Sequence, residues 1–547
     1  MSKPLEENGI HRARLWEIGF YALNNTSTNV YMMLVAYMSY FLIGIVGLGA
    51  VLAGSILTIM RIWDGVTDPI VGFIVDKTNG RFGKNRPFIV IGNVILFVMT
   101  WLMYHIIPTM PTGARFPIFI IMYMVYIIGY TFQCVVTKSA QTCLTNDPAQ
   151  RPIFAMFDTV YNILLMSMMI PVYVTDTLVP KFTLNMATSA DEINALVAKN
   201  PNLANCITNT NGNEILSAFY NPNMFVEMQY TLGAVAAVFA VMAIIGIWRK
   251  DNSKYYGTGK VVKVGLRDYA DTLAHNRAIQ MLVVSASTDK LFMSMKSNST
   301  VMICLFGVVC GNYAMYSSFS QLTSVPTAII SLLGFNFIAR KLGQKMSMVV
   351  GTWGGIIGAV VLILMFIFGN PASMSLPAFR LTNPATWGLL FQDWSGFGIL
   401  FVVLSIVWAG VTSLSSSIVI TMTADCADYE VYRTGKYVPG LMGTLFSFVD
   451  KLVSSFATTI VAAVFAAAGF ATALPTVESP YTTGLLIATL FCYFGAPIIG
   501  WLCNVVAMKF YPLTKEKMAE IQLEIARIKA ETANESIAAE NAVTEDV

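Results

Sequence analysis

RIWDGVTDPIVGFIVDKTNGRFGKNRP, residues 61–87, places two aspartates, Asp64 and Asp68, in a run that is otherwise apolar enough for a lipid bilayer. A carboxylate at the bilayer centre costs about 2.5–3.5 kcal/mol on insertion scales, so an acid in such a run indicates a functional site with a partner. On a helix the two residues are one turn apart, which sets their Cβ atoms about 5–6 Å from each other on one face. The meaning of the pair depends on whether the surrounding chain crosses a membrane.

The composition of the chain is that of a polytopic membrane protein. Of its 547 residues, 56% are hydrophobic and 12% are charged, whereas soluble proteins carry roughly 25% charged residues. Apolar windows of about 20 residues, enough for a helix to cross ~30 Å of hydrocarbon, recur along the sequence. Runs such as TLGAVAAVFAVMAIIGIW lack the alternation of barrel strands. We therefore predict an all-α integral membrane protein with twelve transmembrane helices. The predicted spans are residues 18–43, 50–75, 87–108, 116–142, 153–178, 227–248, 298–318, 321–340, 346–369, 397–422, 441–470 and 481–508.

Basic residues are concentrated in every second predicted loop, which predicts the orientation because lysine and arginine accumulate on the cytoplasmic side. KTNGRFGKNRP and the stretch that follows Arg249 are basic, whereas the alternate loops, such as GIVGLGA and FGNPASMSLPAF, are almost free of lysine and arginine. Both termini are therefore predicted to be cytoplasmic, in agreement with an even number of spans. The segment MSKPLEENGIHRARLWEIGF lacks a short apolar core followed by a cleavage site, so we expect the first helix to be retained.

A polar stretch divides the spans into two sets of six. The predicted divisions are an N-terminal six-helix bundle at 1–248, a cytoplasmic middle loop at 249–297, a C-terminal six-helix bundle at 298–508 and a cytoplasmic helical tail at 509–547. The first bundle carries an external loop over about 178–226, which is long for a connection. The tail has an apolar stripe at helical spacing that needs a cover, either the cytoplasmic face of the same molecule or a partner. This stripe consists of Met518, Ile521, Ile525 and Ile528.

Two carboxylates on one helix face repel each other in a low dielectric, and a proton, a nearby cation or a bound metal ion relieves the repulsion. Hard carboxylate oxygens without sulfur or imidazole suit a hard cation, here a monovalent one such as sodium, and the Thr67 hydroxyl adds an oxygen. Arg61, three residues before Asp64, offers the alternative of an intrahelical salt bridge. One arginine, however, neutralises only one of the two acids.

Other patterns that carry chemistry are absent from the sequence. The eight cysteines and three histidines form neither a metal-ligand spacing nor a disulfide framework. The sequence has no nucleotide-binding loop, nucleophile elbow or metal motif, so we predict that the protein is not an enzyme. No cofactor is expected besides a coupling ion, and nucleic acid is not an expected partner.

The opening stretch resembles the signature of the glycoside-pentoside-hexuronide:cation symporters, a branch of the major facilitator superfamily. Two further stretches agree with that family: TADCADYEVYRTGKYVPGLMGTLFSFVDKL at 423–452 and, more weakly, LTNDPAQR at 144–151. The resemblance implies the major facilitator fold, in which two six-helix bundles rock about a site at the bilayer midplane. It also implies a monomeric, multi-pass protein of the bacterial inner-membrane type that binds a small sugar or glycoside and a monovalent cation.

The resemblance assigns roles to particular residues. Asp64 and Asp68 would coordinate sodium or bind a proton, and Thr67 and Thr131 would supply further oxygen ligands. Lys451 would be a buried amine that pairs with the two acids when the cation is absent. Linkage would then make cation and substrate favour each other's binding. The cytoplasmic gate is expected to comprise Asp76, Arg81, Asp147, Arg151, Asp425 and Asp428.

The sequence departs from the galactoside-transporting members of the family. Cys134 and Lys138 stand where those proteins carry a sugar-binding aspartate and a sugar-stacking tryptophan, and NNTSTN at 24–29 replaces another aspartate. Lys138 and Lys451 could receive an acidic sugar, but nearby aspartates such as Asp158 could equally be their counter-ions. Acidic glycosides, neutral glycosides and other solutes therefore all stay open. The candidate substrate-binding residues are Asn25, Thr28, Lys138, Asp158, Ser447 and Lys451, with Asn162 and Gln321 as further partners for hydroxyl groups.

These inferences predict a secondary active transporter that couples the symport of a sugar or glycoside to a sodium or proton gradient by alternating access. A non-transporting sugar sensor of the same fold is the alternative, because a receptor could keep the binding cavity and signal through the tail.

Overall fold

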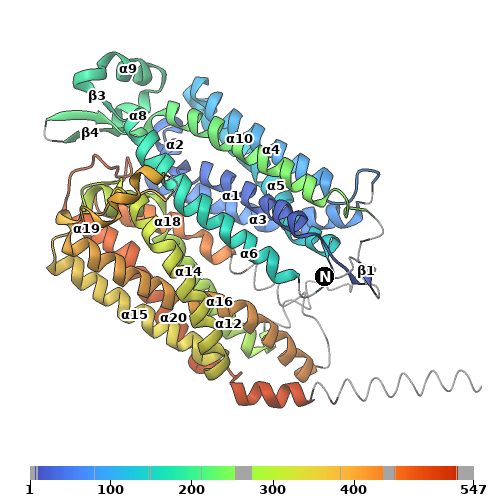
Figure 1. Ribbon diagram of the computed structural model, residues 1–547. Helices are drawn as coiled ribbons and strands as arrows, with labels where there is room; N and C mark the ends of the chain where they lie inside the picture. The colour runs from blue at the N-terminus through green and yellow to red at the C-terminus, as the bar shows by residue number, and fades with distance from the viewer. Residues whose placement is uncertain are drawn as a thin grey trace, which may run out of the picture.

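The computed structural model is built almost entirely of helices (Figure 1). It describes residues 6–7, 10–78, 80–145, 147, 150–210, 212–252, 255, 274–381, 383–434, 449, 451–524 and 527. Within these ranges, nine helices are long and apolar enough to cross a membrane, and a bent pair, Arg277–Lys296 with Ser299–Val309, makes a tenth if it counts as one span. A shorter apolar helix covers Lys451–Ala467. The chain therefore forms the all-helical architecture that its composition predicts.

The first half of the chain consists of long helices that follow the predicted apolar windows. The first of them continues through a π-helical turn and stops at Gly47, whose φ of 88° is a left-handed conformation that glycine adopts without strain. The bounds are α1 Leu15–Leu34, α2 Met38–Phe41, η1 Leu42–Val46, α3 Ala50–Lys77, α4 Arg86–His105, η2 Ile107–Thr109, α5 Thr112–Leu144, α6 Arg151–Asn162, η3 Ile163–Met169, α7 Ile170–Val172, η4 Tyr173–Leu178, α8 Val179–Phe182 and α10 Pro222–Ile247.

The second half repeats this pattern of long apolar helices. Its first span is broken by a bend of 49° between α12 and α13. The bounds are α12 Arg277–Lys296, α13 Ser299–Met302, η8 Ile303–Val309, α14 Met315–Leu342, α15 Gln344–Phe368, η9 Pro371–Ser373, η10 Pro384–Phe391, α16 Gly396–Thr434, α18 Ala457–Ala467, α19 Thr483–Leu490, η11 Phe491–Gly495 and α20 Ala496–Phe510.

Helix α12 corrects the prediction that the middle loop extends to residue 297 and that the seventh span begins at 298. The helix begins at Arg277, and its Ile279 and Leu282 are buried in the second half. The sequence hid this helix because Asp289 and Lys296 interrupt its apolar pattern. The pattern could not show that Asp289 is buried and that Lys296 is covered by aromatic rings. The charges therefore belong to the interior of the second half and not to a connecting loop.

The predicted external loop is a small folded unit between the fifth and sixth spans, at the upper left of Figure 1. It contains helix α9 (Met186–Lys199), the 3-10 helices η5 (Pro201–Cys206) and η6 (Ala218–Tyr220), and a three-stranded antiparallel sheet in the order β3-β5-β4. The strands are β3 Leu184–Asn185, β4 Ile207–Thr210 and β5 Asn213–Leu216; β1 Glu6–Glu7 and β2 Ile10–His11 form a separate hairpin near the N-terminus. Buried Arg115 fixes the unit to the bundle by donating to the carbonyl oxygens of Lys199 and Ile45.

The two halves meet at the end of the molecule that carries this folded unit, which we call the closed end. Tyr40 and Tyr220 of the first half donate hydrogen bonds of 2.8 and 2.9 Å to the carbonyl oxygens of Pro475 and Leu474 in the second half. The hydroxyl of Ser299 donates in the other direction, to the carbonyl oxygen of Ala36, at 2.8 Å. One hydrophobic core that includes residues of both halves lies behind these contacts.

At the opposite end, which carries the N-terminal segment and the tail, the hydrophobic cores of the two halves are separate. Val75, Val136 and Phe154 belong to a cluster made only of first-half residues. Ile418 and Met508 belong to a cluster made only of second-half residues. The helices of the two halves diverge toward this end (Figure 1). We call it the open end.

The described part of the tail is a helix over residues 515–524 that packs on the second half. Ile521 is fully buried in the second-half cluster, and Met518 packs against the same cluster. Gln522 donates a hydrogen bond of 2.6 Å to Asp428 of α16. The sequence left open whether the apolar stripe packs on the same molecule or on a partner. Met518 and Ile521 pack on the same molecule. Ile525 and Ile528 lie outside the described residues.

Candidate functional site

The two aspartates of the opening stretch lie on α3 where this helix packs closely against α18. Gly54 permits the close approach, because a Cβ atom at that position would be 2.9 Å from the carbonyl oxygen of Thr458. Thr58 strengthens the contact by donating to the carbonyl oxygen of Ser455 at 2.8 Å. The short helix that begins at Lys451 is therefore held against the α3 face that bears the acids.

Lys451 bridges both carboxylates. Its Nζ lies 3.3 Å from Oδ2 of Asp64 and also donates to Oδ2 of Asp68. The Asp64 side chain is 1% exposed, whereas those of Asp68 and Lys451 are 33% and 30% exposed. The buried acid thus faces the protein interior, and the outer acid and the amine remain accessible.

Two threonine hydroxyls complete the surroundings of Asp64. Thr131 of α5 donates to Oδ1 of Asp64 at 3.1 Å, and its oxygen also lies 3.1 Å from the hydroxyl oxygen of Thr67. Thr67 in turn donates to the backbone oxygen of Asp64 at 3.0 Å. All four residues predicted for the cation site are therefore close together, as an oxygen-rich cluster within reach of one ammonium group.

Arg61 does not form the intrahelical salt bridge that the sequence offered as an alternative. The Arg61 residue is exposed, and its described hydrogen bond is to the sulfur of Met32 at 4.0 Å. The ion-pair partner of both acids is instead Lys451, which is more than 380 residues away in sequence. The repulsion between the two carboxylates is therefore reduced by the Lys451 ammonium group, and not by an intrahelical pair with Arg61.

The predicted substrate-binding residues are only partly brought together. Asn25 donates to the Asp158 carboxylate at 2.7 Å, so this acid is paired with an amide and not with Lys138. Thr28 is buried and donates to the backbone oxygen of Asn24 in its own helix, so its hydroxyl is already used. Lys138 is exposed on α5. Ser447 lies outside the described residues.

The predicted gate residues lie at the open end, where the described ones contact their own half. Asp147 pairs with Arg12 of the N-terminal segment at 2.5 Å, Asp428 binds the tail helix, and Arg81 is exposed. Burial raises the pKa of Asp425 to about 6, with a further contribution from the neighbouring Asp428 carboxylate. The side chains of Asp76 and Arg151 lie outside the described residues.

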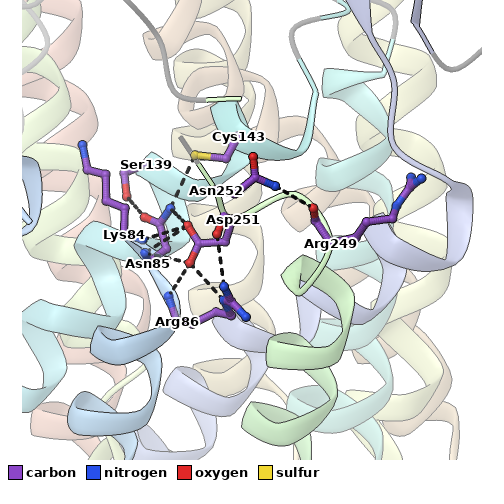
Figure 2. A network of polar contacts seen from close by, with 8 residues as sticks. All are labelled: Lys84, Asn85, Arg86, Ser139, Cys143, Arg249, Asp251 and Asn252. Carbon is purple, nitrogen blue, oxygen red and sulfur yellow. Dashed lines mark hydrogen bonds and ion pairs between the residues drawn. The ribbon is translucent and has the colours of Figure 1, made fainter. Parts of the chain in front are cut away.

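Sequence reasoning missed Asp251, which forms the central anion of the polar network in Figure 2. Its fully buried carboxylate accepts hydrogen bonds from the backbone N–H groups of Lys84, Asn85 and Arg86, at 3.1, 3.0 and 2.9 Å. These amides begin helix α4, where a negative charge is favoured by the helix dipole. The only sequence signal was an acid that directly follows Arg249 and Lys250 in a basic loop.

Gly83 shows how tightly the loop closes around this anion. Its φ is 92°, and a Cβ atom would be 2.2 Å from the Asp251 carboxylate. The end of the loop KTNGRFGKNRP is therefore tied to the segment that directly follows α10.

Replacing Asp251 with Ala is expected to destabilise the first half, because the buried N–H group of Asn85 and the partly buried N–H groups of Lys84 and Arg86 lose their acceptor, and a buried unsatisfied group costs about 1–3 kcal/mol. The apparent midpoint of thermal unfolding of the purified protein in detergent measures the effect. Asp191→Ala, at an exposed position of the folded external unit, is the control. Equal midpoints for the two variants would contradict the role of the anion.

Comparison with known proteins defines the class to which this fold and site belong. The computed model resembles the crystal structure of a bacterial homologue of the human lysosomal transporter Spinster in an inward-facing, unoccupied conformation, with a TM-score of 0.54, 13% identity, and coverage of 93% of this chain and 97% of that one. At this identity the likeness shows the fold alone, which is that of a membrane transporter.

The family follows from sequence comparison. The model of the MFS/sugar transport protein family matches residues 21–515, and the chain belongs to that family. It is similar to a glucuronide carrier protein homologue of Escherichia coli (strain K12), at 20% identity over 507 residues, 92% of this chain and 94% of the relative. It is also similar to the isoprimeverose transporter of Lactiplantibacillus pentosus, at 19% identity over 496 residues, 90% of this chain and 88% of the relative. The predicted relation to glycoside-pentoside-hexuronide:cation symporters is confirmed, and the chain is a transporter and not an enzyme.

Proposed function

We propose that this protein is a symporter that moves a glycoside together with sodium or a proton, and that the cation binds at Asp64 and Asp68. The observation that carries the proposal is the position of Lys451, whose ammonium group lies between the two carboxylates. An internal cation at this place marks where a transported cation would be stabilised. The membership of a sugar transport family and the glucuronide carrier homologue among its relatives support a glycoside as the second cargo.

The mechanism follows from competition between two cations for the same oxygens. Without a coupling ion, Lys451 contacts both acids and offsets one of their two negative charges, at an attraction of about 4 kcal/mol for charges 4 Å apart at an effective dielectric constant of 20. Sodium would displace the ammonium group and take oxygens from Asp64, Asp68 and the hydroxyls of Thr67 and Thr131. Protonation of Asp68, the more exposed acid, would likewise release Lys451. Either event changes the contact between the two halves at the middle of the bundle.

The architecture that supports this mechanism is a pair of six-helix bundles. We propose twelve spans, with the seventh formed by the bent pair α12–α13 and the eleventh by the helix that begins at Lys451. The middle loop then shortens to about 249–276, and the other division points stay as the sequence predicts. The basic loops place the open end and both termini in the cytoplasm of a bacterial inner membrane, so the described conformation would be inward-facing.

Uptake into membrane vesicles tests the function. We expect labelled glycosides, screened as glucosides, galactosides, xylosides and glucuronides, to accumulate when an inward sodium or proton gradient is imposed and to equilibrate when it is collapsed. Comparing the two gradients identifies the ion. Binding without any gradient-driven accumulation would support the sensor and contradict the symporter.

Replacing Asp68 with Asn is expected to lower gradient-driven accumulation at least tenfold, because the site loses one of its two charges while Lys451 still pairs with Asp64 and competes with the cation for it. Exchange of labelled for unlabelled substrate should partly persist, because it requires no net movement of the cation. Asp191→Asn, at an exposed carboxylate of the external unit, is the matched control. Unchanged accumulation in the Asp68 variant would place the cation site elsewhere.

A further inference from the structure

Lys296 is a second lysine within the helices of the second half, and its surroundings differ from those of Lys451. It lies in the last turn of α12, with Nζ 3.7 Å from the centroid of the Trp408 ring and 5.2 Å from that of Tyr493. Both rings are buried, at 3% exposure, and Lys296 itself is half-buried. The ammonium group therefore rests on two aromatic faces in the interior of the second half.

The protein compensates this charge only in part. Across the part of the chain that the structure describes, no carboxylate lies within ion-pair distance of Lys296, whereas Lys451 contacts two. The aromatic faces attract the ammonium group, and the C-terminus of α12 adds a smaller favourable contribution. Removing an ammonium group from water costs more than these two contributions return. An anion beside Lys296 would make up the difference.

The position of Lys296 is where a transported molecule would reach the closed end. Three residues further along the chain, Ser299 forms the hydrogen bond to Ala36 that joins the two halves. Helix α12 also contacts α18, which continues the helix that begins at Lys451. Lys296 thus lies close in sequence to the junction of the halves and on a helix that packs against α18.

The rings beside Lys296 are themselves buried, and the indole N–H of Trp408 is already donated to the carbonyl oxygen of Gly355 at 2.9 Å. The Lys296 ammonium group is therefore the charged group that this cluster offers to a ligand. One lysine carries one positive charge and matches a singly charged group better than a phosphate dianion.

We propose that Lys296 binds the carboxylate of an acidic glycoside, a uronide, and thereby selects it over the neutral sugar. This inference rests on the proposed function and narrows its substrate class. Lys138, the amine that the sequence offered for the same task, is exposed, and an exposed ammonium group is hydrated without any substrate. Lys296 is less hydrated because it is half-buried, so a substrate carboxylate would stabilise its charge more than that of Lys138.

A pair of compounds that differ only at C6 tests the proposal: p-nitrophenyl β-D-glucuronide, with a carboxylate, and p-nitrophenyl β-D-glucoside, with a hydroxymethyl group. Each is measured as a competitor of uptake and as a transported substrate in vesicles. We expect the wild-type protein to prefer the glucuronide at least tenfold. Lys296→Gln should abolish this preference by weakening the glucuronide at least tenfold while changing the glucoside less than twofold, and Lys296→Arg should restore part of it.

Lys290→Gln is the matched control, because it removes an exposed lysine from the same helix. It should leave the preference unchanged. A Lys296→Gln variant that weakens both compounds equally, with Lys296→Arg restoring neither, would assign the lysine a structural role and overturn the inference. If the wild-type protein accumulates the glucoside and excludes the glucuronide, the role of Lys296 is overturned. The proposed symport of a glycoside would then still hold. If no glycoside in the wider screen accumulates under either gradient, the proposed function fails together with the inference.

Discussion

The bridge between Lys451 and the two aspartates of α3 is the interaction on which the arrangement of the two halves depends. The acids belong to the first half and the amine to the second, so the charges are neutralised only while α3 and the helix that begins at Lys451 stay in contact. Their separation in a low dielectric would expose two repelling carboxylates on one helix face. The ion pair thus connects the two halves of the molecule. A cation that took the place of the Lys451 ammonium group would break this connection.

The contacts at the closed end are of a different kind. There the tyrosine hydroxyls and Ser299 bind backbone carbonyl oxygens across the halves, above a shared apolar core. Neutral hydrogen bonds of this type contribute roughly 0.5–1.5 kcal/mol each, so the closed end can separate in steps once the central connection is changed. The open end, with separate cores and with Asp251 fixing its own loop within the first half, does not oppose such a movement.

The sequence allowed the grouping of Asp64, Asp68 and Lys451 to be predicted because these residues stand out in the sequence. Asp64 and Asp68 stand out by their spacing in an apolar run, and Lys451 stands out by resemblance to a family. The missed features all depend on distant partners. Helix α12 was taken for a loop because its charges have no local explanation, and Asp251 was overlooked because its three amide donors are more than 160 residues away. The sequence suggested Thr28 as a hydrogen-bonding partner for substrate. Its hydroxyl is buried and donates to the backbone oxygen of Asn24 in its own helix, which the sequence does not show.

Lys296 and Lys451 would together favour an anionic substrate once the coupling cation is bound. While Lys451 is paired with the acids, Lys296 is the one enclosed amine of the pair that lacks a carboxylate partner in the described part of the chain. In the proposed mechanism, a cation that occupied Asp64 and Asp68 would release the Lys451 ammonium group, and the second half would then carry a further uncompensated positive charge. The attraction for an anionic substrate beside Lys296 would rise accordingly. Since linkage is reciprocal, a bound anion holds the released amine away from the acids and favours the cation. Cation and acidic glycoside would thus bind cooperatively through the charge of Lys451, even without direct contact between the two ligands.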